Sequence, residues 1–355
     1  MRQVDLDSLI GQPLGAFTGN GTTGLAIALR ALDVNGGRVG IPSSVCLAVP
    51  LAVIASGNIP EFIDVDDRNL GINLSGLASR IEELDAVIAV HNYGYPSEMQ
   101  EVAQLCQLHS VPLVEDACLL YGCEINGLPV GSFGQISVIS FGTGKILDVG
   151  GGGAVFAGDS HLRALLRQAA GQFPISNSAL LGSIQLMSSS HTQVYNEFFL
   201  QTFNPTRLRA FGAWMAAVSS QLLLSADKDL EPKLRKAVRD LDSRIEVRRE
   251  RYALLEDLLL DRLSPSTGFL HNPPVDSVPW RLNSRAVQQA ILFRRLKVAG
   301  VPASTWHPPA QVFFSDRKIM APIAETWGRT VVNLPLGGDS ESFGRMVQTI
   351  DRELS

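Results

Sequence analysis

The chain has 355 residues, of which 45% are hydrophobic and 18% are charged, a composition typical of a globular protein with a sizeable core. This composition excludes a chain that is disordered throughout. With 30 Lys and Arg against 35 Asp and Glu, the formal net charge is −5. The chain therefore has no broad basic surface for nucleic acids or anionic lipids, and we expect neither as a partner.

Nothing in the sequence predicts a membrane span or a secretion signal. The longest uncharged apolar stretch, from Val45 to Ala55, is interrupted by Pro50 and is far shorter than the roughly 20 residues that cross a bilayer. The N-terminal residues lack the basic and apolar regions of a signal peptide, so we expect a cytoplasmic protein. The cysteines lack the paired spacing of zinc sites; we expect no metal, and reduced, mostly buried thiols at Cys46, Cys106, Cys118 and Cys123.

Between residues 37 and 157, short apolar runs alternate with segments of helical periodicity, the pattern of a parallel sheet with crossover helices. The predicted strands are Arg38–Pro42, Glu61–Val65, Ala86–His91, Pro112–Glu115, Ile136–Phe141 and Gly153–Ala157. The last two are close along the chain and could form one antiparallel pair. The predicted helices are Thr22–Leu32, Val45–Ser56, Leu74–Glu83 and Met99–His109, the last with Ser97 as its candidate cap.

The rest of the chain is mainly helical in pattern. A stretch rich in Ser, Asn and Gln at Ile175–Gln193 predicts a variable loop, and the amphipathic run Asp227–Leu263 predicts one or two long helices joining two lobes. We interpret the arginines of this run as a solvated helix surface. We expect a large α/β domain over residues 1–240, then the long helix and a small α+β domain over 241–355. The linker between the lobes is marked by Pro265, Pro273, Pro274 and Pro279.

The glycines of Gly19–Gly24 have the spacing GxGxxG and open a predicted helix, whose free N–H groups can bind phosphate. A dinucleotide-binding fold also needs a strand before these glycines and an acidic residue about 20 residues later. The preceding segment is a poor strand, and residues 34–60 contain no Asp or Glu. The motif therefore predicts a phosphate site of another kind, or a plain turn without a ligand.

Two charged residues follow predicted buried strands. Lys145 ends the run Phe141-Gly-Thr-Gly-Lys145, which lacks the first glycine and the final Ser or Thr of a P-loop, so it is either a solvated loop residue or a functional amine. Asp116 either caps the next helix or binds a ligand where the strands end. A phosphate cradle, an aspartate and a lysine at three strand ends suit a phosphorylated pyridine aldehyde, with its ring nitrogen on Asp116 and a Schiff base on Lys145.

Seven motifs in a fixed order resemble those of one family. They are Asn20-Gly-Thr-Thr23, Phe62-Ile-Asp-Val-Asp66, Val90-His-Asn-Tyr-Gly-Tyr-Pro96, Glu115-Asp-Ala117, Ser140-Phe-Gly-Thr-Gly-Lys145 with Gly150–Gly153, His307-Pro-Pro309 and Asn333-Leu-Pro-Leu336. Through most of its length the chain resembles the DegT/DnrJ/EryC1/StrS family of pyridoxal-phosphate-dependent aminotransferases, best known as sugar aminotransferases of fold type I. The resemblance implies a large domain with a mostly parallel seven-stranded sheet and a small C-terminal α+β domain.

The resemblance also implies roles for individual residues. Lys145 would hold pyridoxal 5′-phosphate and then act as general acid and base, and Asp116 would keep the ring nitrogen protonated. The implied ligands of the phosphate are Gly21, Thr22, Thr23 and Ser140. Such enzymes are homodimers that move an amino group from glutamate or glutamine to a keto or aldehyde substrate, such as a keto sugar. The alternative is a family member with a different pyridoxal chemistry, or with a regulatory or partner role and no turnover.

Several positions depart from the family pattern. Fewer residues than usual precede Asn20, and Cys46 stands where an aromatic ring usually covers one face of the cofactor. The partner-chain motif Asn-Tyr-Arg has only a weak match in Asn204-Pro-Thr-Arg207. Other residues that differ are Leu119, Tyr121 and Gly151, which replace Gln, His and an acidic residue. These departures affect the expected substrate more than the expected cofactor.

Overall fold

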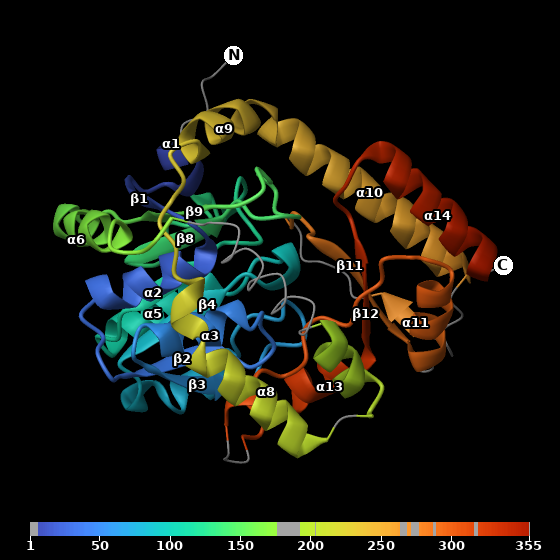
Figure 1. The fold of residues 1–355 in the computed structure, drawn as a ribbon, viewed down its shortest axis with the longest axis horizontal. Helices are drawn as coiled ribbons and strands as arrows, with labels where there is room; N and C mark the ends of the chain where they lie inside the picture. Colours follow the sequence, from blue (N-terminus) through green and yellow to red (C-terminus); the bar gives the residue numbers. More distant parts are fainter. Residues whose placement is uncertain are drawn as a thin grey trace.

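The computed structural model describes residues 6–175, 192–202, 204–262, 268–270, 277–286, 289–315 and 319–354. A seven-stranded sheet lies on one side of the molecule and a three-stranded sheet on the other (Figure 1). Most of the predicted variable loop and linker, including Pro265, Pro273 and Pro274, lies outside the described residues. No helix within those ranges is long and apolar enough to span a membrane.

The large sheet is mostly parallel, with the strand order β1-β9-β8-β5-β4-β2-β3. Its parallel strands are β2 (Arg38–Pro42), β3 (Ile59–Ile63), β4 (Ala86–Val90), β5 (Leu113–Asp116) and β8 (Ile136–Ser140). Two antiparallel pairings place β9 (Gly153–Phe156) beside β8 and β1 (Leu14–Thr18) at the edge. The six predicted strands are confirmed to within about two residues at each end, and so is the antiparallel pair.

The strand β1 corrects the prediction that the segment before Gly19 is a poor strand. Its five residues pair with β9, with an irregular register between Leu14 and Ala16. Because β1 is an edge strand and only two of its residues are buried, it lacks the continuous apolar pattern of the central strands.

Helices cover both faces of the large sheet, which explains its apolar strands. Ile88 belongs to the core formed with α2 and α3, whereas its neighbour Val87 belongs to the core on the opposite face, with α4 and α5. The helices of this part are α1 (Leu6–Ile10), α2 (Gly21–Ala31), α3 (Ala48–Ala55), α4 (Leu74–Ala78), α5 (Met99–Leu108) and α6 (Ser160–Ala170). A small hairpin follows β5, with strands β6 (Glu124–Ile125) and β7 (Leu128–Pro129).

Three local predictions are wrong in detail. Because α3 begins at Ala48, Cys46 lies in the loop after β2 and not in a helix. Ser97 does not cap α5, because its hydroxyl donates instead to the carbonyl of Val90 at 2.7 Å. All four cysteines are free, but only Cys106 is buried, so the thiols are not mostly buried.

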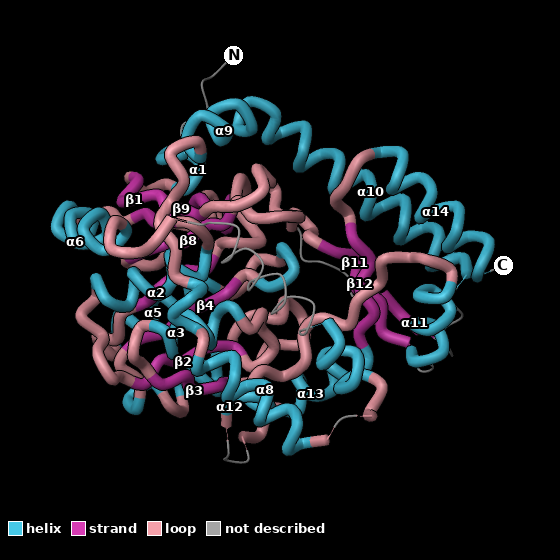
Figure 2. The backbone as a smooth tube through the Cα atoms, in the orientation of Figure 1, coloured by secondary structure: helices cyan, strands magenta, loops and turns pink. Residues whose placement is uncertain are grey.

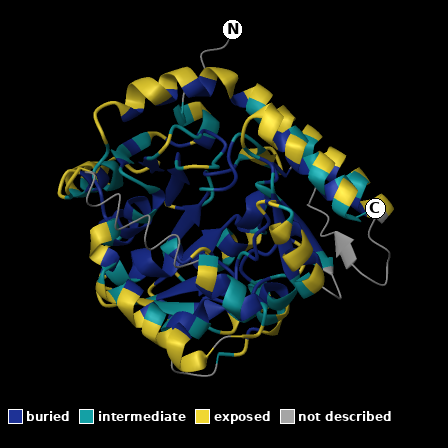
Figure 3. Cartoon of the chain, turned by 45° about the vertical axis from the view of Figure 1, so that its right-hand side comes forward, coloured by how far each residue is buried: buried dark blue, intermediate teal, exposed yellow. Residues whose placement is uncertain are grey.

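Two helices, α9 (Leu230–Ala237) and α10 (Leu241–Arg262), form an arc from the large sheet to the small one, as the amphipathic run predicts (Figure 1). Their outward faces are exposed while the sheets beneath are buried (Figure 3). The small sheet is antiparallel and α10, α11 and α14 pack around it (Figure 2). Its elements are β10 (Gly268–Leu270), β11 (Arg281–Ala286), β12 (Val331–Pro335), α11 (Gln289–Val298) and α14 (Ser340–Leu354).

Short helices connect the two parts on the side opposite the arc. They are α8 (Pro205–Ala217), α12 (Gln311–Phe314) and α13 (Pro322–Thr330). Asp64, from the motif after β3, accepts hydrogen bonds from the N–H groups of Ile323 and Ala324 at 3.0 and 2.9 Å. This carboxylate therefore caps α13 and ties the C-terminal part to the large sheet.

Candidate active site

Asp116 is the last residue of β5 and lies at the carboxyl end of the parallel strands. Its side chain is 4% exposed, and its Oδ1 accepts a hydrogen bond from the N–H of Cys118 at 2.9 Å. The residues that follow form a turn, so Asp116 is not the cap of a helix. Cys118 does not use all the acceptor capacity of this buried carboxylate, which can therefore also bind a ligand.

A buried hydrogen-bond network holds the preceding residue. Glu115 accepts from the N–H of Gly131 at 2.7 Å and from Nε2 of His91 at 3.0 Å. Nδ1 of the same ring accepts from the N–H of Ser97 at 3.1 Å, which assigns the ring proton to Nε2. The network links β4 to β5 at the point where Asp116 ends its strand.

The N-terminus of α2 lies at the same end of the sheet. Asn20 caps the helix. The N–H groups of Gly21 and Thr22 belong to the first turn, have no partner among the described residues, and can therefore bind an anion. A Cβ on Gly21 would lie 2.9 Å from Sγ of Cys118 and 3.3 Å from Cβ of Ser140, so the helix approaches the ends of β5 and β8 closely.

Thr23 is a correction to the predicted phosphate ligands. Its side chain is fully buried, and its hydroxyl donates to Oδ1 of Asn20 at 3.0 Å and accepts from the N–H of Leu224 at 2.8 Å. Its own N–H also donates to Asn20, at 2.8 Å. Both polar groups are used within the protein, which leaves Thr22, with a half-buried side chain, as the threonine available to a phosphate.

Lys145 lies in a glycine-rich loop after β8. Asp148 organises this loop by accepting from the N–H groups of Gly144 at 2.7 Å and Gly150 at 2.9 Å. Both glycines have positive φ, which suits residues without a side chain. The lysine is half-buried, and its Nζ lies 5.7 Å from the ring centre of Trp280. The loop thus presents an amine beside an aromatic ring.

Arg248 of α10 fastens this loop from outside. It is 6% exposed, and its Nη2 donates to the carbonyls of Gly144 at 2.6 Å and Lys145 at 3.0 Å. Burial lowers the pKa of its guanidinium. Arg244 and Arg251 of the same helix also donate to backbone carbonyls. The prediction of a purely solvated basic surface is therefore wrong for the inward face of α10, because helical spacing does not tell which charged face turns inward.

Two thiols lie within reach of both charges. The pKa of Cys46 is raised, chiefly because its surroundings desolvate it; Lys145 lowers this pKa and Asp116 raises it. The side chain is nevertheless exposed, which is the condition of a group on the wall of a recess. Burial also raises the pKa of Cys118 well above its ordinary value, and the same two charges act on it. Because such effects are short-ranged, these four side chains lie close together, and the place where they meet is called the recess below.

Ser140 and Tyr121 support the floor of this recess. Ser140 ends β8, and its Oγ accepts from the N–H of Gly142 at 3.4 Å. The buried hydroxyl of Tyr121 accepts from the N–H of Leu147 at 2.8 Å and donates to the carbonyl of Ser140 at 3.4 Å. Burial raises the pKa of Tyr121, so the phenol stays neutral and holds the backbone of the lysine loop.

Tyr93 and Gly94, from the motif after β4, bring the C-terminal part to this recess. The hydroxyl of Tyr93 accepts from the N–H of His307 at 2.7 Å. The backbone carbonyl of Tyr93 accepts from the N–H of Trp280 at 2.7 Å. Gly94 has a φ of +81°, and a Cβ there would lie 2.1 Å from the carbonyl oxygen of Val278. Only glycine permits this approach, which positions Trp280 near Lys145.

Aromatic residues outside the sequence motifs form one wall of the recess. The rings of Trp280 and Trp306 stack with their centres 5.5 Å apart, and Cζ of Arg281 lies 4.4 and 4.5 Å from them. Asn333 holds this wall, because its Oδ1 accepts from the N–H of Trp306 at 2.6 Å. The adjacent pair Trp280-Arg281 is the sequence feature that could have indicated this wall, because tryptophan is rare in the chain, with 4 residues.

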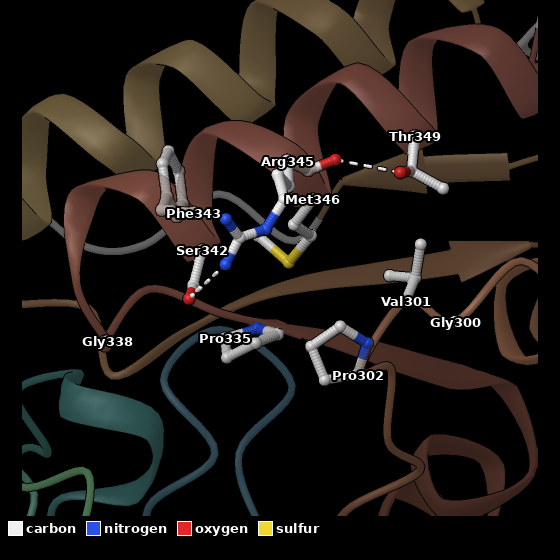
Figure 4. A pocket seen from close by; sticks show the side chains of 11 residues that line it. Gly300, Val301, Pro302, Pro335, Gly338, Ser342, Phe343, Arg345, Met346 and Thr349 are labelled. Atoms are coloured by element: carbon white, nitrogen blue, oxygen red, sulfur yellow. Dashed lines mark hydrogen bonds between the residues drawn. The ribbon is translucent and has the colours of Figure 1, made fainter.

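A separate pocket of about 410 Å³ lies between α14 and the loop at residues 300–302 (Figure 4). Arg345 lines it, but this guanidinium pairs with Glu341 and donates to the hydroxyl of Ser342 at 3.1 Å. The pocket therefore lacks the unpaired charges that meet at Lys145. Across the described ranges, no group of three or more His, Cys, Asp or Glu side chains is arranged to hold a metal ion.

Comparisons with known proteins find similarity to the family that the sequence motifs resemble. Residues 4–177 match the model of the DegT/DnrJ/EryC1/StrS aminotransferase family. UDP-N-acetyl-3-dehydro-alpha-D-glucosamine 3-aminotransferase of Acidithiobacillus ferrooxidans is 34% identical over 221 residues, 60% of each chain. L-glutamine:2-deoxy-scyllo-inosose aminotransferase of Streptomyces lividus is 28% identical over 249 residues, 68% of this chain and 51% of that protein. The matched segments of these two relatives thus span less than two thirds of their length.

Solved structures match over nearly the whole chain. An aminotransferase of Streptoalloteichus hindustanus has a TM-score of 0.76 at 22% identity, covering 99% of this chain and 89% of that one. A DegT/DnrJ/EryC1/StrS aminotransferase of Brucella abortus has a TM-score of 0.73 at 18% identity, covering 97% and 87%. At these identities the likeness shows the fold, that of the fold type I aminotransferases with a mostly parallel seven-stranded sheet. Together, these comparisons show that residues 4–177 match the model of the DegT/DnrJ/EryC1/StrS aminotransferase family and that the chain has the fold of a solved aminotransferase of that family.

Proposed function

We propose that the protein is a pyridoxal-phosphate-dependent aminotransferase. The observation that carries this proposal is the meeting of three groups at one end of the sheet: the buried carboxylate of Asp116, the amine of Lys145 and the free N–H groups at the start of α2. The family supports the same cofactor, because its members depend on pyridoxal phosphate.

The donor set of the recess fits this cofactor. Gly21 and Thr22 offer N–H groups to a phosphate at a helix N-terminus, with Ser140 as a further donor. Gly21 lets the start of α2 approach Cys118 closely, because a Cβ there would lie 2.9 Å from its Sγ. The carboxylate of Asp116 suits a protonated pyridine nitrogen, and the amine of Lys145 suits an aldehyde. When bound, pyridoxal phosphate supplies an electron sink for the negative charge that develops on the substrate carbon.

The two charged residues have separate tasks in the proposed reaction. Asp116, held by the backbone of its turn, would keep a proton on the ring nitrogen through a charge-assisted hydrogen bond. Lys145 moves a different proton, the one exchanged at the substrate carbons. Its Nζ accepts the proton that the α-carbon of the amino donor loses, and later delivers a proton to the carbon of the acceptor that becomes the new amine-bearing carbon. The loop bonds of Arg248 and Asp148 keep this amine in place.

We infer that glutamate or glutamine is the amino donor and that a keto or aldehyde compound, such as a keto sugar, is the acceptor. Support comes from the names of two relatives, one of which acts on a UDP-linked dehydro sugar and the other on an inosose with L-glutamine. We also propose that the protein is cytoplasmic and works as a homodimer. Sedimentation of the active protein tests the dimer, and an active monomer would contradict it.

The test of the function is a half-reaction. The purified protein is loaded with pyridoxal phosphate and mixed with L-glutamate or L-glutamine, while the absorbance of the cofactor and the release of the 2-oxo acid are followed. We expect stoichiometric 2-oxo acid from at least one donor, and none from Lys145→Ala. Lys233→Ala, which removes an exposed lysine of α9, is the matched control and should behave like the wild type. If the protein binds the cofactor but releases no 2-oxo acid from either donor, the proposal is contradicted. That result would favour a different pyridoxal chemistry or a non-catalytic role.

A further inference from the structure

Arg281, at the start of β11, carries a charge that no acid among the described residues neutralises. Over the residues that the structure describes, no carboxylate lies within ion-pair distance of it, and its buried Nε has no hydrogen-bond partner. Burial lowers the pKa of Arg281 to about 10, so the guanidinium remains charged at neutral pH. A desolvated charge without a partner is costly, and the cost is removed when an anion binds.

The position of this guanidinium relates it to the proposed reaction centre. Its Cζ lies 4.4 Å from the ring centre of Trp280, and Nζ of Lys145 lies 5.7 Å from the same ring centre. The indole is fixed, because its Nε1 donates to the carbonyl of Gly144 at 3.1 Å. Trp306 contacts the guanidinium as well, at 4.5 Å. Two rings therefore contact the guanidinium of Arg281, and one of them also contacts the amine of Lys145.

The surrounding charges favour an anion at this place. Arg248 is a second buried cation whose charge lowers the pKa of Arg281, whereas the other titratable neighbour, Tyr93, is neutral because burial raises its pKa. Lys145 adds a third cation near the same indole. Two carboxylates lie nearby: Asp116, which the proposed cofactor engages, and Asp148, which accepts from the N–H groups of Gly144 and Gly150.

A comparison within the same strand shows that an unpaired arginine is not the rule here. Arg285 lies four residues along β11, and its Cζ also lies over a tryptophan, 5.7 Å from the ring centre of Trp327. Its Nη1, however, pairs with Asp67 at 3.3 Å. The structure thus has two similar arginines, one with an acid partner and one without.

We propose that Arg281 binds a carboxylate of the compound that reacts at Lys145, and so makes the enzyme select substrates that carry one. The inference rests on the proposed function and deepens it. The two parallel N–H bonds of a guanidinium match the geometry of a carboxylate, and lysine does not reproduce this match. The carboxylate belongs either to the amino donor or to the acceptor, and the two sources are distinguished by separate probes.

The test measures binding without turnover. Tryptophan fluorescence is titrated with 2-oxoglutarate, the product of a glutamate donor, and with D-glucuronate, a sugar that carries a carboxylate. Dimethyl 2-oxoglutarate and D-glucose are the uncharged counterparts. We expect at least one acid to bind and its uncharged counterpart to bind more weakly. Arg281→Met should lower the affinity for that acid by about 10-fold or more, as expected when a charge-assisted pair is lost. Arg285→Met is the matched control and should leave the affinity unchanged.

Unchanged affinity of both acids in Arg281→Met would overturn the inference, and so would an equal loss in Arg285→Met. If Arg281→Met does not fold, Arg281→Lys decides: we expect weaker acid binding at an unchanged melting temperature, and wild-type affinity would again overturn the inference. The titrations are run with and without pyridoxal phosphate. If the protein binds the cofactor and transaminates, but Arg281→Met leaves the affinity for the acids unchanged, only the inference is refuted. If the protein binds no cofactor, the proposed function is refuted independently of the titration.

Discussion

Arg248→Met tests whether the lysine loop depends on α10. The variant removes two charge-assisted hydrogen bonds, to the carbonyls of Gly144 and Lys145 at 2.6 and 3.0 Å. Each such bond contributes about 1.5–3 kcal/mol. Desolvation of the guanidinium offsets part of this, because its Nη1 is buried without a partner and burial lowers its pKa. We therefore expect a net loss of about 2–4 kcal/mol from the roughly 5–15 kcal/mol that keep a domain folded.

Urea unfolding followed by circular dichroism measures this loss. Arg248→Met should lower the midpoint at an unchanged slope, and it should also reduce the amount of pyridoxal phosphate that reacts with Lys145. Arg239→Met, which removes an exposed arginine nearby, is the control and should leave both quantities unchanged. A loss below about 0.5 kcal/mol, the range of ordinary surface substitutions, would refute the role assigned to Arg248.

Four further predictions concern the recess. Asp116→Asn should keep the cofactor bound but slow the glutamate half-reaction by about 100-fold or more, because a neutral amide stabilises the charged ring less; stopped-flow absorbance measures this, and a wild-type rate would contradict it. Since desolvation raises the pKa of Cys46, its alkylation by iodoacetamide should increase with pH around a midpoint above the ordinary thiol value. Asp116→Asn should lower that midpoint, and mass spectrometry that finds no such shift would contradict the coupling. Cys46→Phe should shift the absorbance of the bound cofactor, whereas Cys46→Ser should be mild; identical spectra would place Cys46 away from the ring. Gly94→Ala should lower the free energy of unfolding by more than about 2 kcal/mol in thermal unfolding, because it adds a clash with Val278 to the strain of a positive φ. Gly57→Ala is the control for the strain alone, because Gly57 has a φ of +88° and open space around it. Equal losses in the two variants would refute the clash.

The parts of the site that follow the strand ends could be predicted from the sequence. Apolar runs reveal parallel strands, and the residues just after such strands meet at one end of the sheet. Asp116 and Lys145 both follow this logic. Their electrostatic coupling to Cys46 agrees with it.

The parts that depend on the packing of one half against the other could not be predicted. Arg248 follows the same helical spacing as its exposed neighbours, and only the packing of α10 against the lysine loop buries it. Trp280 and Arg281 come after a segment with no clear periodicity, and they reach the recess through backbone contacts of Tyr93 and Gly94. Thr23 illustrates the opposite error: a matching motif does not show that the N–H of this residue already donates to Oδ1 of Asn20.

The most direct test of the central claim locates the cofactor on the chain. The protein is incubated with pyridoxal phosphate and reduced with borohydride, which makes the reversible bond between an aldehyde and an amine permanent, and its peptides are then analysed by mass spectrometry. The account predicts one modified residue, Lys145, and no specific modification in Lys145→Ala. Modification mainly at another lysine, or an equal yield in Lys145→Ala, would contradict it.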